Sequence, residues 1–396
     1  MIYIERTITN KLLETATYFP IVAIIGARQV GKTTLIKKCF PEKEYFSFEP
    51  IANREYFNND PWAFFERFKN GAFFDEVQHV PDLFSYLQTT VDNNQLAGQF
   101  IVSGSQNLFI NEKIAESLSG RVGIIKLFPF TLNELAKADL LKDTINSICS
   151  GWYPPIYSKN IPSKLWYPNY IDTYIEKDVR KLLNIRDIYK FRKFLEICAS
   201  SVGEIFVLEN IIKGAGISKN TAYHWLGVLE QTFIIYFLRP SHKNYKKRIV
   251  KSPKLYFYDT GLICSLLNLT EKNIQNINNI GIYGHLFENM IVSEIKKELH
   301  NLGLSNNLYY WRDDKGKNEV DLLIEKNQKY IPIEIKSSKT PKGSFATKLN
   351  IWINDISDNS ENGYLIYGGD EKRIMKNSVF IPWEKVECIY KHILSD

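Results

Sequence analysis

The chain has 396 residues, a length at which a single hydrophobic core stops growing and a polypeptide divides into domains. Hydrophobic residues make up 44% and charged residues 24%, which excludes a disordered or low-complexity protein. A formal charge of +6 permits a polyanionic partner without requiring one. The five cysteines form neither a C-x-x-C pair nor a disulfide framework, and no leader-like start or membrane-length apolar run occurs. We therefore expect a cytoplasmic protein with no membrane contact.

The first informative feature is a glycine-containing loop that follows an apolar, β-branched run at residues 21–25. Such a run is typical of a strand buried on both faces. The loop has the pattern G-x-x-x-x-G-K-[ST], made of Gly26, Ala27, Arg28, Gln29, Val30, Gly31, Lys32 and Thr33, and a helix is expected from Thr34. Main-chain N–H groups in such a loop bind phosphates, Lys32 adds positive charge and Thr33 offers a hydroxyl to Mg²⁺. The sequence predicts ATP and Mg²⁺ as ligands of residues 26–34; a chance glycine loop is the alternative.

A second buried strand, at residues 71–74, ends in Asp75 and Glu76. Two adjacent carboxylates at a strand end are costly unless they serve a cation or a reacting water. We expect Asp75 to orient the Mg²⁺ shell and contact the nucleotide, and Glu76 to act as the catalytic base. Two solvated acids in a turn are the alternative.

Polar residues also follow the third expected strand, at residues 100–102. Ser103, Ser105 and Gln106 would lie at the carboxyl edge of the sheet, where open α/β sheets bind ligands, so one of them is a candidate phosphate contact. Simple turn residues are an equal alternative. Arg121, before an expected strand at residues 122–127, is a candidate for stabilising transition-state charge in its own subunit or a neighbour's. A surface salt bridge explains Arg121 equally well.

The elements between these strands are a helix at residues 34–39, a strand at 45–48 and a helical stretch at 62–69. This β-α-β-α-β order predicts a parallel sheet.

Four segments together, at residues 26–33, 73–78, 103–105 and 117–122, resemble the bacterial and archaeal AAA-type ATPases whose ATPase domain precedes a region of uncertain function. Further matches follow in that family's order at residues 174–179, 247–248, 252–261 and 287–289. The resemblance implies a carboxyl-terminal domain similar to restriction-endonuclease-like PD-(D/E)XK nucleases. It also implies a homo-oligomer, since AAA-type sites usually form between subunits.

The middle of the chain contains a proline- and aromatic-rich stretch at residues 152–168, which we interpret as a connection between domains. Beyond it, residues 207–213 and 218–231 have the spacing of a helix-turn-helix, with Ser218 as the cap of the second helix. That second helix presents Lys219, Asn220, Thr221, Tyr223 and His224, and a basic stretch without acids follows, containing His242, Lys243, Lys246, Lys247, Arg248, Lys251 and Lys254. This pattern favours a winged helix that binds double-stranded DNA. A packing or subunit-contact module is the alternative.

The last group of candidate residues lies on two segments, residues 320–325 and 330–336, in which the alternation of side chains is typical of strands. With a two-residue turn at Asn327 and Gln328, Asp321 faces Glu334, and Lys336 lies on the same face. Opposed carboxylates destabilise a sheet, so a divalent cation held by both is expected, with Lys336 stabilising phosphate charge or positioning water.

Together with the resemblance, this spacing makes Asp321, Glu334 and Lys336 the candidate catalytic residues, and Glu288, on a helix at residues 283–299, a further metal ligand. The alternative is a surface hairpin in which Lys336 pairs with neighbouring acids. Because no proline precedes Asp321, the fold can persist without cleavage.

The predicted architecture is α/β: a P-loop NTPase parallel-sheet domain (1–150), a helical and winged-helix region (151–275) and a mixed α/β restriction-endonuclease-like domain (276–396). Two functions follow from it. One is an ATPase coupled to DNA binding and Mg²⁺-dependent cleavage; the other is an ATP-controlled switch or binding module with an inactive nuclease-like domain.

Overall fold

The computed structural model divides the chain into two compact units. The amino-terminal unit comprises Glu5–Phe130 and Val228–Ile234, and the carboxyl-terminal unit comprises Met1–Ile4, Thr131–Gly227 and Ile235–Asp396. The structure describes residues 2–94, 96–104, 117–179, 187–241, 252–277, 281–304, 307–313, 315–356, 362–375 and 378–395.

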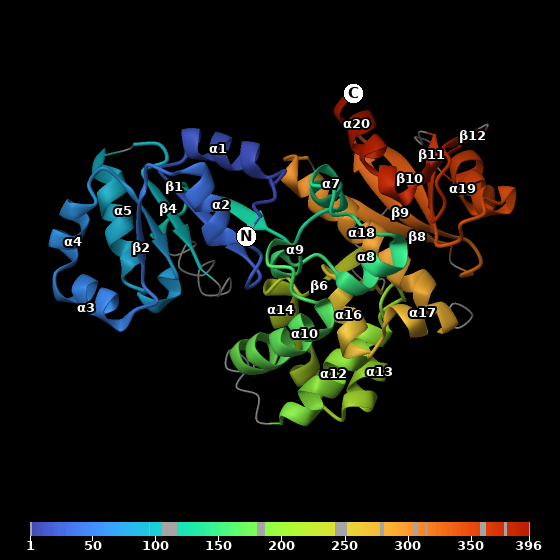
Figure 1. Ribbon diagram of the computed structural model, residues 1–396. Helices are drawn as coiled ribbons and strands as arrows, with labels where there is room; N and C mark the ends of the chain where they lie inside the picture. The colour runs from blue at the N-terminus through green and yellow to red at the C-terminus, as the bar shows by residue number, and fades with distance from the viewer. Residues whose placement is uncertain are drawn as a thin grey trace. The chain divides into compact units, whose positions relative to one another are not determined.

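The amino-terminal unit is built on a parallel sheet of five strands in the order β2-β3-β4-β1-β5 (Figure 1). Its strands are β1 (Ile21–Gly26), β2 (Glu44–Ser47), β3 (Ala72–Asp75), β4 (Phe100–Ser103) and β5 (Val122–Leu127). Every residue of β1, β3 and β4 is buried, as expected for short apolar runs in the centre of a parallel sheet. The parallel sheet predicted from the sequence is confirmed.

Helices on this sheet provide the rest of the amino-terminal core. They are α1 (Thr9–Tyr18), α2 (Lys32–Cys39), α3 (Ile51–Asn59), α4 (Pro61–Arg67) and α5 (Leu83–Asn94), with a 3-10 turn, η1 (Val77–His79), after β3. Helix α4 begins with Asp60 as its N-cap and Pro61 at its first position, where a missing N–H costs nothing. The Phe64 ring contacts those of Phe46 and Phe74, with centroids 5.1 and 5.5 Å apart, so α4 is held on the apolar interior of β2 and β3.

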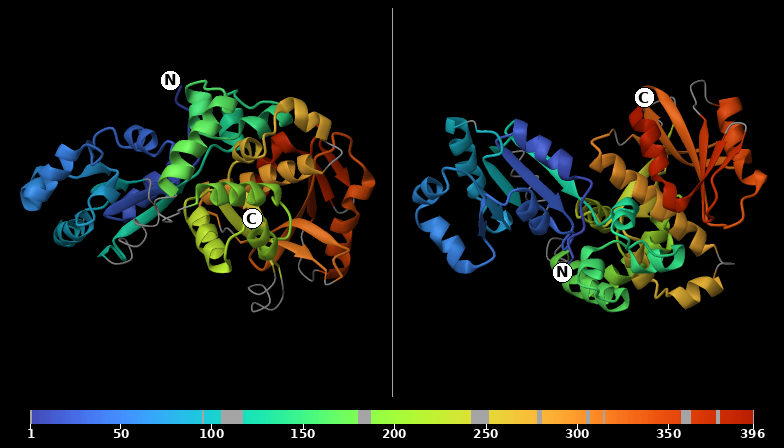
Figure 2. Two further views of the ribbon diagram at one scale, coloured as in Figure 1. Left: turned by 90° about the horizontal axis from the view of Figure 1, so that it is seen from below. Right: turned by 45° about the horizontal axis from the view of Figure 1, so that its top comes forward.

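The carboxyl-terminal unit contains a mixed sheet of eight strands in the order β12-β13-β11-β10-β9-β8-β6-β7. The strands are β6 (Ile235–Pro240), β7 (Lys254–Phe257), β8 (Leu308–Arg312), β9 (Glu319–Lys326), β10 (Lys329–Lys336), β11 (Gly363–Tyr367), β12 (Arg373–Met375) and β13 (Ser378–Pro382). The orange and red strands β8–β13 lie together in one layer in both views of Figure 2. Strands β6 and β7, from the middle of the chain, extend the same sheet at one edge.

Most of the chain between residues 131 and 301 is helical. The helices are α7 (Leu132–Lys137), α8 (Thr144–Ser150), α9 (Pro154–Ser158), α10 (Ser163–Tyr170), α12 (Ile188–Ser200), α13 (Leu208–Ala215), α14 (Lys219–Gln231), α16 (Thr260–Leu266), α17 (Glu271–Ile277) and α18 (Ile282–Asn301), with a π-helical segment η2 (Ile171–Val179). Helix α18 packs against β7 and β10. After β10 come η4 (Gly343–Ala346), α19 (Thr347–Ile351), η5 (Trp352–Ile356), η6 (Trp383–Lys385) and α20 (Glu387–Ser395). Within the described ranges, no helix has the length and apolar character needed to cross a bilayer.

The proline- and aromatic-rich stretch is not a connection, and that interpretation was wrong. It contains α9 and α10, and Trp152, Tyr153 and Tyr167 are among the largest fully buried side chains in the part of the chain that the structure describes. Tyr153 and Trp166 have ring centroids 4.7 Å apart. The prolines of α9 occupy its first turn, where they are tolerated, so the composition that suggested a loop instead begins a packed helix.

The two helices of the predicted helix-turn-helix are confirmed as α13 and α14. Gly216 ends α13 in the left-handed conformation, with φ of 63°, and the Ser218 hydroxyl accepts from the Thr221 amide at 3.1 Å. Residues 242–251 of the basic stretch lie outside the described residues. Lys254, the last member of that stretch, starts β7 and is 3% exposed, so its assignment to a DNA-contacting wing was wrong. The winged helix itself and the three-domain division stay predictions.

A buried carboxylate links the aromatic helices to the segment after β7. Asp259 is 2% exposed and caps α16, where its carboxylate accepts the Leu262 amide at 2.8 Å. The same carboxylate accepts the Trp152 amide at 2.6 Å and the Tyr167 hydroxyl at 2.7 Å. Residues 252–261, which carried part of the family resemblance, therefore have a structural role here.

Replacing Asp259 with Ala should lower the free energy of unfolding by about 2–4 kcal/mol, because one substitution removes a helix cap and leaves other buried donors unpaired. The matched control is Asp143→Ala, which removes the exposed cap of α8 and should cost about 1 kcal/mol. Urea unfolding followed by tryptophan fluorescence measures both. Equal losses in the two variants would contradict the linking role of Asp259.

Candidate functional site

The loop between β1 and α2 has the backbone geometry of a phosphate-binding loop. A Cβ atom on Gly26 would lie 2.2 Å from the Leu127 carbonyl oxygen, and Gly31 has φ of 94°, so both positions favour glycine. Gly31 is also the N-cap of α2, which directs the amino end of this helix at the loop. Ala27 and Val30 are buried, whereas Arg28, Gln29 and Thr34 are exposed. The loop predicted at residues 26–33 therefore has the form that phosphate binding needs.

Lys32 lies inside this loop. Its Nζ donates to the carbonyl oxygens of Gly26 and Ala27, each at 3.0 Å, and the residue is 7% exposed. Burial lowers the pKa of Lys32 to about 8, although the carboxylates of Glu76 and Asp75 oppose the shift. A phosphate oxygen would replace the carbonyl partners and favour the charged form.

Asp75 collects hydrogen bonds from three elements around it. Its Oδ2 accepts the Thr33 hydroxyl at 2.8 Å and the Tyr45 hydroxyl at 3.2 Å, and its Oδ1 accepts the Ser103 hydroxyl. The residue is 5% exposed, so these donors keep a buried carboxylate stable. A hydroxyl and a carboxylate in contact form an all-oxygen donor set, which fits Mg²⁺ at Thr33 and Asp75.

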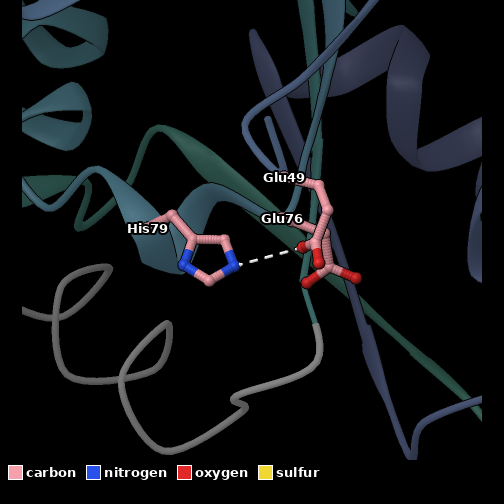
Figure 3. Close-up of side chains that lie close together, drawn as sticks. All are labelled: Glu49, Glu76 and His79. Atoms are coloured by element: carbon pink, nitrogen blue, oxygen red, sulfur yellow. Dashed lines mark hydrogen bonds and ion pairs between the residues drawn. The ribbon is translucent and has the colours of Figure 1, made fainter. Parts of the chain in front are cut away.

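Glu76 has an unusual backbone and several polar neighbours. Its φ of 56° lies in the left-handed region, where a residue other than glycine is strained. The side-chain amide of Gln78 donates a hydrogen bond to the Glu76 carboxylate. Figure 3 shows the His79 ring and the carboxylates of Glu49 and Glu76 lying close together, with one ligand atom of each within 4.8 Å of the others. His79 Nε2 lies 3.3 Å from Glu49 Oε2.

Sequence reasoning did not select Tyr45, Glu49, Gln78 or His79. The last two follow Glu76 by two and three residues, so proximity along the chain was an available signal. Tyr45 and Glu49 flank the end of β2, whose pairing with β3 brings them to this edge.

The sequence offered three further candidates at the carboxyl ends of these strands, and the strand registers test one of them. Ser103 pairs with Asp75 and with Ile24, so it lies beside the phosphate-binding loop, as expected. Ser105 and Gln106 lie outside the described residues.

Arg121 lies at the amino ends of the parallel strands, whereas the phosphate-binding loop lies at their carboxyl ends. It precedes β5, which runs parallel to β1 with Val122 beside Ile21 and Leu127 beside Gly26. At ~3.3 Å per residue, Arg121 is about 20 Å from Leu127 along the strand. Its guanidinium instead holds both oxygens of Asp92, with Nη2 at 2.9 Å from Oδ2. Action on phosphate within its own subunit is therefore excluded, and the surface ion pair explains Arg121.

The hairpin of β9 and β10 has the predicted register. Asn327 and Gln328 form the turn with φ of 49° and 65°, and Ile333 pairs with Leu322. Asp321 and Glu334 are next in this register, and the Asp321 carboxylate accepts the Ile335 amide at 2.8 Å. The predicted juxtaposition of the two acids is present.

Lys336 lies between these two acids. Its Nζ is 2.6 Å from Glu334 Oε1 and 3.5 Å from Asp321 Oδ2, which is the pairing that the alternative interpretation described. Glu334 is 1% exposed, and its Oε2 has no hydrogen-bond partner. Burial, followed by the nearby Asp321 charge, raises the pKa of Glu334 to about 8, although Lys336 opposes the shift.

Glu288 reaches the same cluster from α18, but two donors of β7 already bind it. Lys254 Nζ lies 3.1 Å and the Tyr256 hydroxyl 2.6 Å from Glu288 Oε1. Lys254 also pairs with Glu319 at 2.6 Å. Burial acts to lower the pKa of Lys254, but the charges of Glu288, Asp321 and Glu319 outweigh it and raise the pKa. The sequence missed this contact because Lys254 belonged to a basic run.

Comparisons with known proteins agree with the amino-terminal site. Residues 18–136 match the model of a family described as an AAA domain. Residues 141–273 and 283–386 match two further families, each described as a domain of unknown function. Residues 18–136 thus form an AAA-type domain with a P-loop.

The curated relatives include uncharacterized proteins of Mycobacterium bovis and Mycobacterium tuberculosis, each 27% identical over 347 residues, covering 86% of this chain and 76% of theirs. Among solved structures, a Walker-type ATPase of Pyrococcus abyssi has a TM-score of 0.45 at 13% identity, covering 67% of this chain and 96% of that one. The RuvB Holliday junction branch migration motor of Thermotoga maritima has a TM-score of 0.30 at 16% identity, covering 68% and 92%. These superpositions are too partial to assign a function.

The pKa of Lys32 predicts how nucleotide affinity changes with pH. Because Lys32 loses its proton near pH 8 in the nucleotide-free protein, ADP binding above that pH requires proton uptake. The affinity should fall by up to about tenfold per pH unit between pH 8 and 9.5. Calorimetric titration with ADP in metal-free buffer measures it. The control is Lys32→Arg, whose guanidinium does not titrate; the same fall in that variant would exclude Lys32 as the cause.

Proposed function

We propose that this chain hydrolyses ATP at its AAA-type site and that the bound nucleotide controls a carboxyl-terminal unit that binds DNA. The observation that carries the proposal is the contact of Thr33 with Asp75 at 2.8 Å, which joins the phosphate-binding loop to the acid after β3. This pair provides the oxygen ligands for the Mg²⁺ that accompanies a nucleoside triphosphate.

Each residue of the site has a role in this proposal. Lys32 and the loop amides hold the β- and γ-phosphates, and Thr33 and Asp75 hold Mg²⁺, which neutralises charge on the phosphates when it is bound. Glu76 accepts the proton of the attacking water. Its left-handed backbone and its hydrogen bond from Gln78 hold the carboxylate in place.

DNA binding is proposed for the amino-terminal half of α14 together with the basic stretch after β6. Lys219, Asn220, Tyr223 and His224 are exposed there, and Lys219 lies 5.9 Å from the Tyr223 ring centroid. Exposed cations and polar groups on one helix suit contacts with phosphates and base edges in a groove.

The carboxyl-terminal cluster supports a divalent-cation site at Asp321 and Glu334. Glu334 offers a buried oxygen without a hydrogen-bond partner, and a cation would compensate the two opposed acids. In the cleaving form of the proposal, Lys336 stabilises charge on a DNA phosphate.

The second function, a nucleotide-controlled switch without cleavage, is favoured by one observation. Lys336 already pairs with both Glu334 and Asp321, so these two acids have an internal cationic partner without a metal ion. A cluster of this kind keeps the fold of the sheet without chemistry.

Hydrolysis is tested by two variants of the ATP site. Glu76→Gln should lower kcat by at least about 100-fold while ATP binding changes little, because only proton transfer is lost. Lys32→Ala should weaken ATP binding itself. Phosphate release and calorimetry separate the two effects; an unchanged rate in Glu76→Gln would remove its role as the base.

Coupling to DNA is tested by measuring hydrolysis with and without double- and single-stranded DNA. We expect stimulation by double-stranded DNA that weakens at higher salt and falls several-fold in Lys219→Ala. Lys190→Ala, on the exposed face of α12, is the matched control. Equal rates with and without DNA would contradict the coupling.

Cleavage is tested with Mn²⁺ and plasmid DNA. Cutting that disappears in Asp321→Ala and Lys336→Ala supports the cleaving form. Intact DNA together with an active ATPase supports the switch.

A further inference from the structure

The acidic cluster of the carboxyl-terminal sheet contains an additional cation. Four carboxylates gather there, those of Glu288, Glu319, Asp321 and Glu334, and the single ammonium of Lys336 is shared by Asp321 and Glu334. On the other side, Lys254 Nζ lies 3.1 Å from Glu288 and 2.6 Å from Glu319. The Lys254 side chain is 4% exposed, so this ammonium group is enclosed by the acids.

We propose that Lys254 is a resident cation that takes the place of a second metal ion in this cluster, leaving one divalent-cation position, at Asp321 and Glu334. The inference rests on the proposed metal site and specifies how many ions it holds. It changes the predicted role of Glu288, which holds Lys254 in place of a metal.

The strand geometry explains why Lys254 reaches Glu288. Lys254 and Tyr256 are two residues apart on β7, so their side chains leave the same face of the strand. Both donate to the same oxygen, Oε1 of Glu288, with the Tyr256 hydroxyl at 2.6 Å. That oxygen therefore has two donors before any ion arrives, which opposes its use as a metal ligand.

The two sides of the cluster differ in the partners available to their carboxylates. Both sides contain an ammonium group, Lys336 on one and Lys254 on the other, but Glu334 also keeps an unpartnered buried oxygen, Oε2. Glu319 has a second cationic partner, Arg312, at 3.6 Å. A divalent ion would find a free ligand atom at Glu334, whereas at Glu288 it would have to displace donors from Oε1, which already accepts from Lys254 and Tyr256.

Removing this ammonium group should create a metal position. In Lys254→Met the side-chain stem remains while the charge is lost, and Glu288 and Glu319 are left without their shared ammonium partner. A divalent ion then compensates both. We expect Lys254→Met to bind about one Mn²⁺ per chain more than the wild type, and Lys254→Arg, which keeps a cation, to bind no more than the wild type.

The experiment counts bound Mn²⁺ by electron paramagnetic resonance on the full chain without nucleotide, which limits the contribution of the ATP site. The additional ion should disappear when Glu288→Gln is combined with Lys254→Met. A folded Lys254→Met protein that binds no additional Mn²⁺ overturns the proposal.

If Lys254→Met does not fold, two variants of the acids test the role of Lys254 in its place. In the wild-type background, Glu288→Gln should leave Mn²⁺ binding unchanged, whereas Asp321→Asn should reduce it at least tenfold. Loss of Mn²⁺ binding in Glu288→Gln to the extent seen in Asp321→Asn would overturn the proposal. A wild-type chain without any Asp321-dependent Mn²⁺ would instead reject the proposed metal site, and an ion gained by Lys254→Met would still support the role of Lys254.

Discussion

The carboxylate of Asp75 is the group on which the ATPase site depends. It accepts hydroxyl hydrogen bonds from Thr33 on α2, Tyr45 on β2 and Ser103 on β4, and it is 5% exposed. Because a buried carboxylate is stable only with such donors, the strand order that places β3 between β2 and β4 also fixes the position of the P-loop threonine. Glu76, the proposed catalytic base, follows directly in the chain, so its position depends on the same carboxylate.

Features defined by short-range rules could be predicted from the sequence. The G-x-x-x-x-G-K-T loop fixes its own backbone, since Gly26 and Gly31 occupy positions that a side chain would disfavour. The pairing of β9 with β10 follows from a two-residue turn, which determines every later pair, including the one that brings Asp321 to Glu334. In both cases a local constraint settles the geometry without knowledge of the rest of the fold.

Features that depend on contacts between residues far apart in the sequence could not be predicted. Arg121 precedes β5 and was a candidate for contacting phosphate. Because β5 runs parallel to β1, Arg121 lies at the amino ends of the strands, away from the phosphate-binding loop. Lys254 belongs to a basic run, and only the addition of β7 to the carboxyl-terminal sheet reveals that it pairs with Glu288 and Glu319. Residues 152–168 have the composition of a loop, but they contain two helices whose aromatic rings are buried. A charged or aromatic side chain is compatible with surface and interior alike until its partners are known.

The measurement that tests the account most directly is calorimetric titration of the Asp75→Asn variant with ADP, with and without Mg²⁺. Asparagine keeps the size and one oxygen of Asp75 but removes the charge that holds a divalent cation. The account predicts that Mg²⁺ strengthens ADP binding in the wild type and has no effect in the variant, while metal-free ADP binding, which depends on Lys32 and the loop amides, persists in both. An undiminished Mg²⁺ effect in Asp75→Asn would show that the cation is held elsewhere and would contradict the central claim.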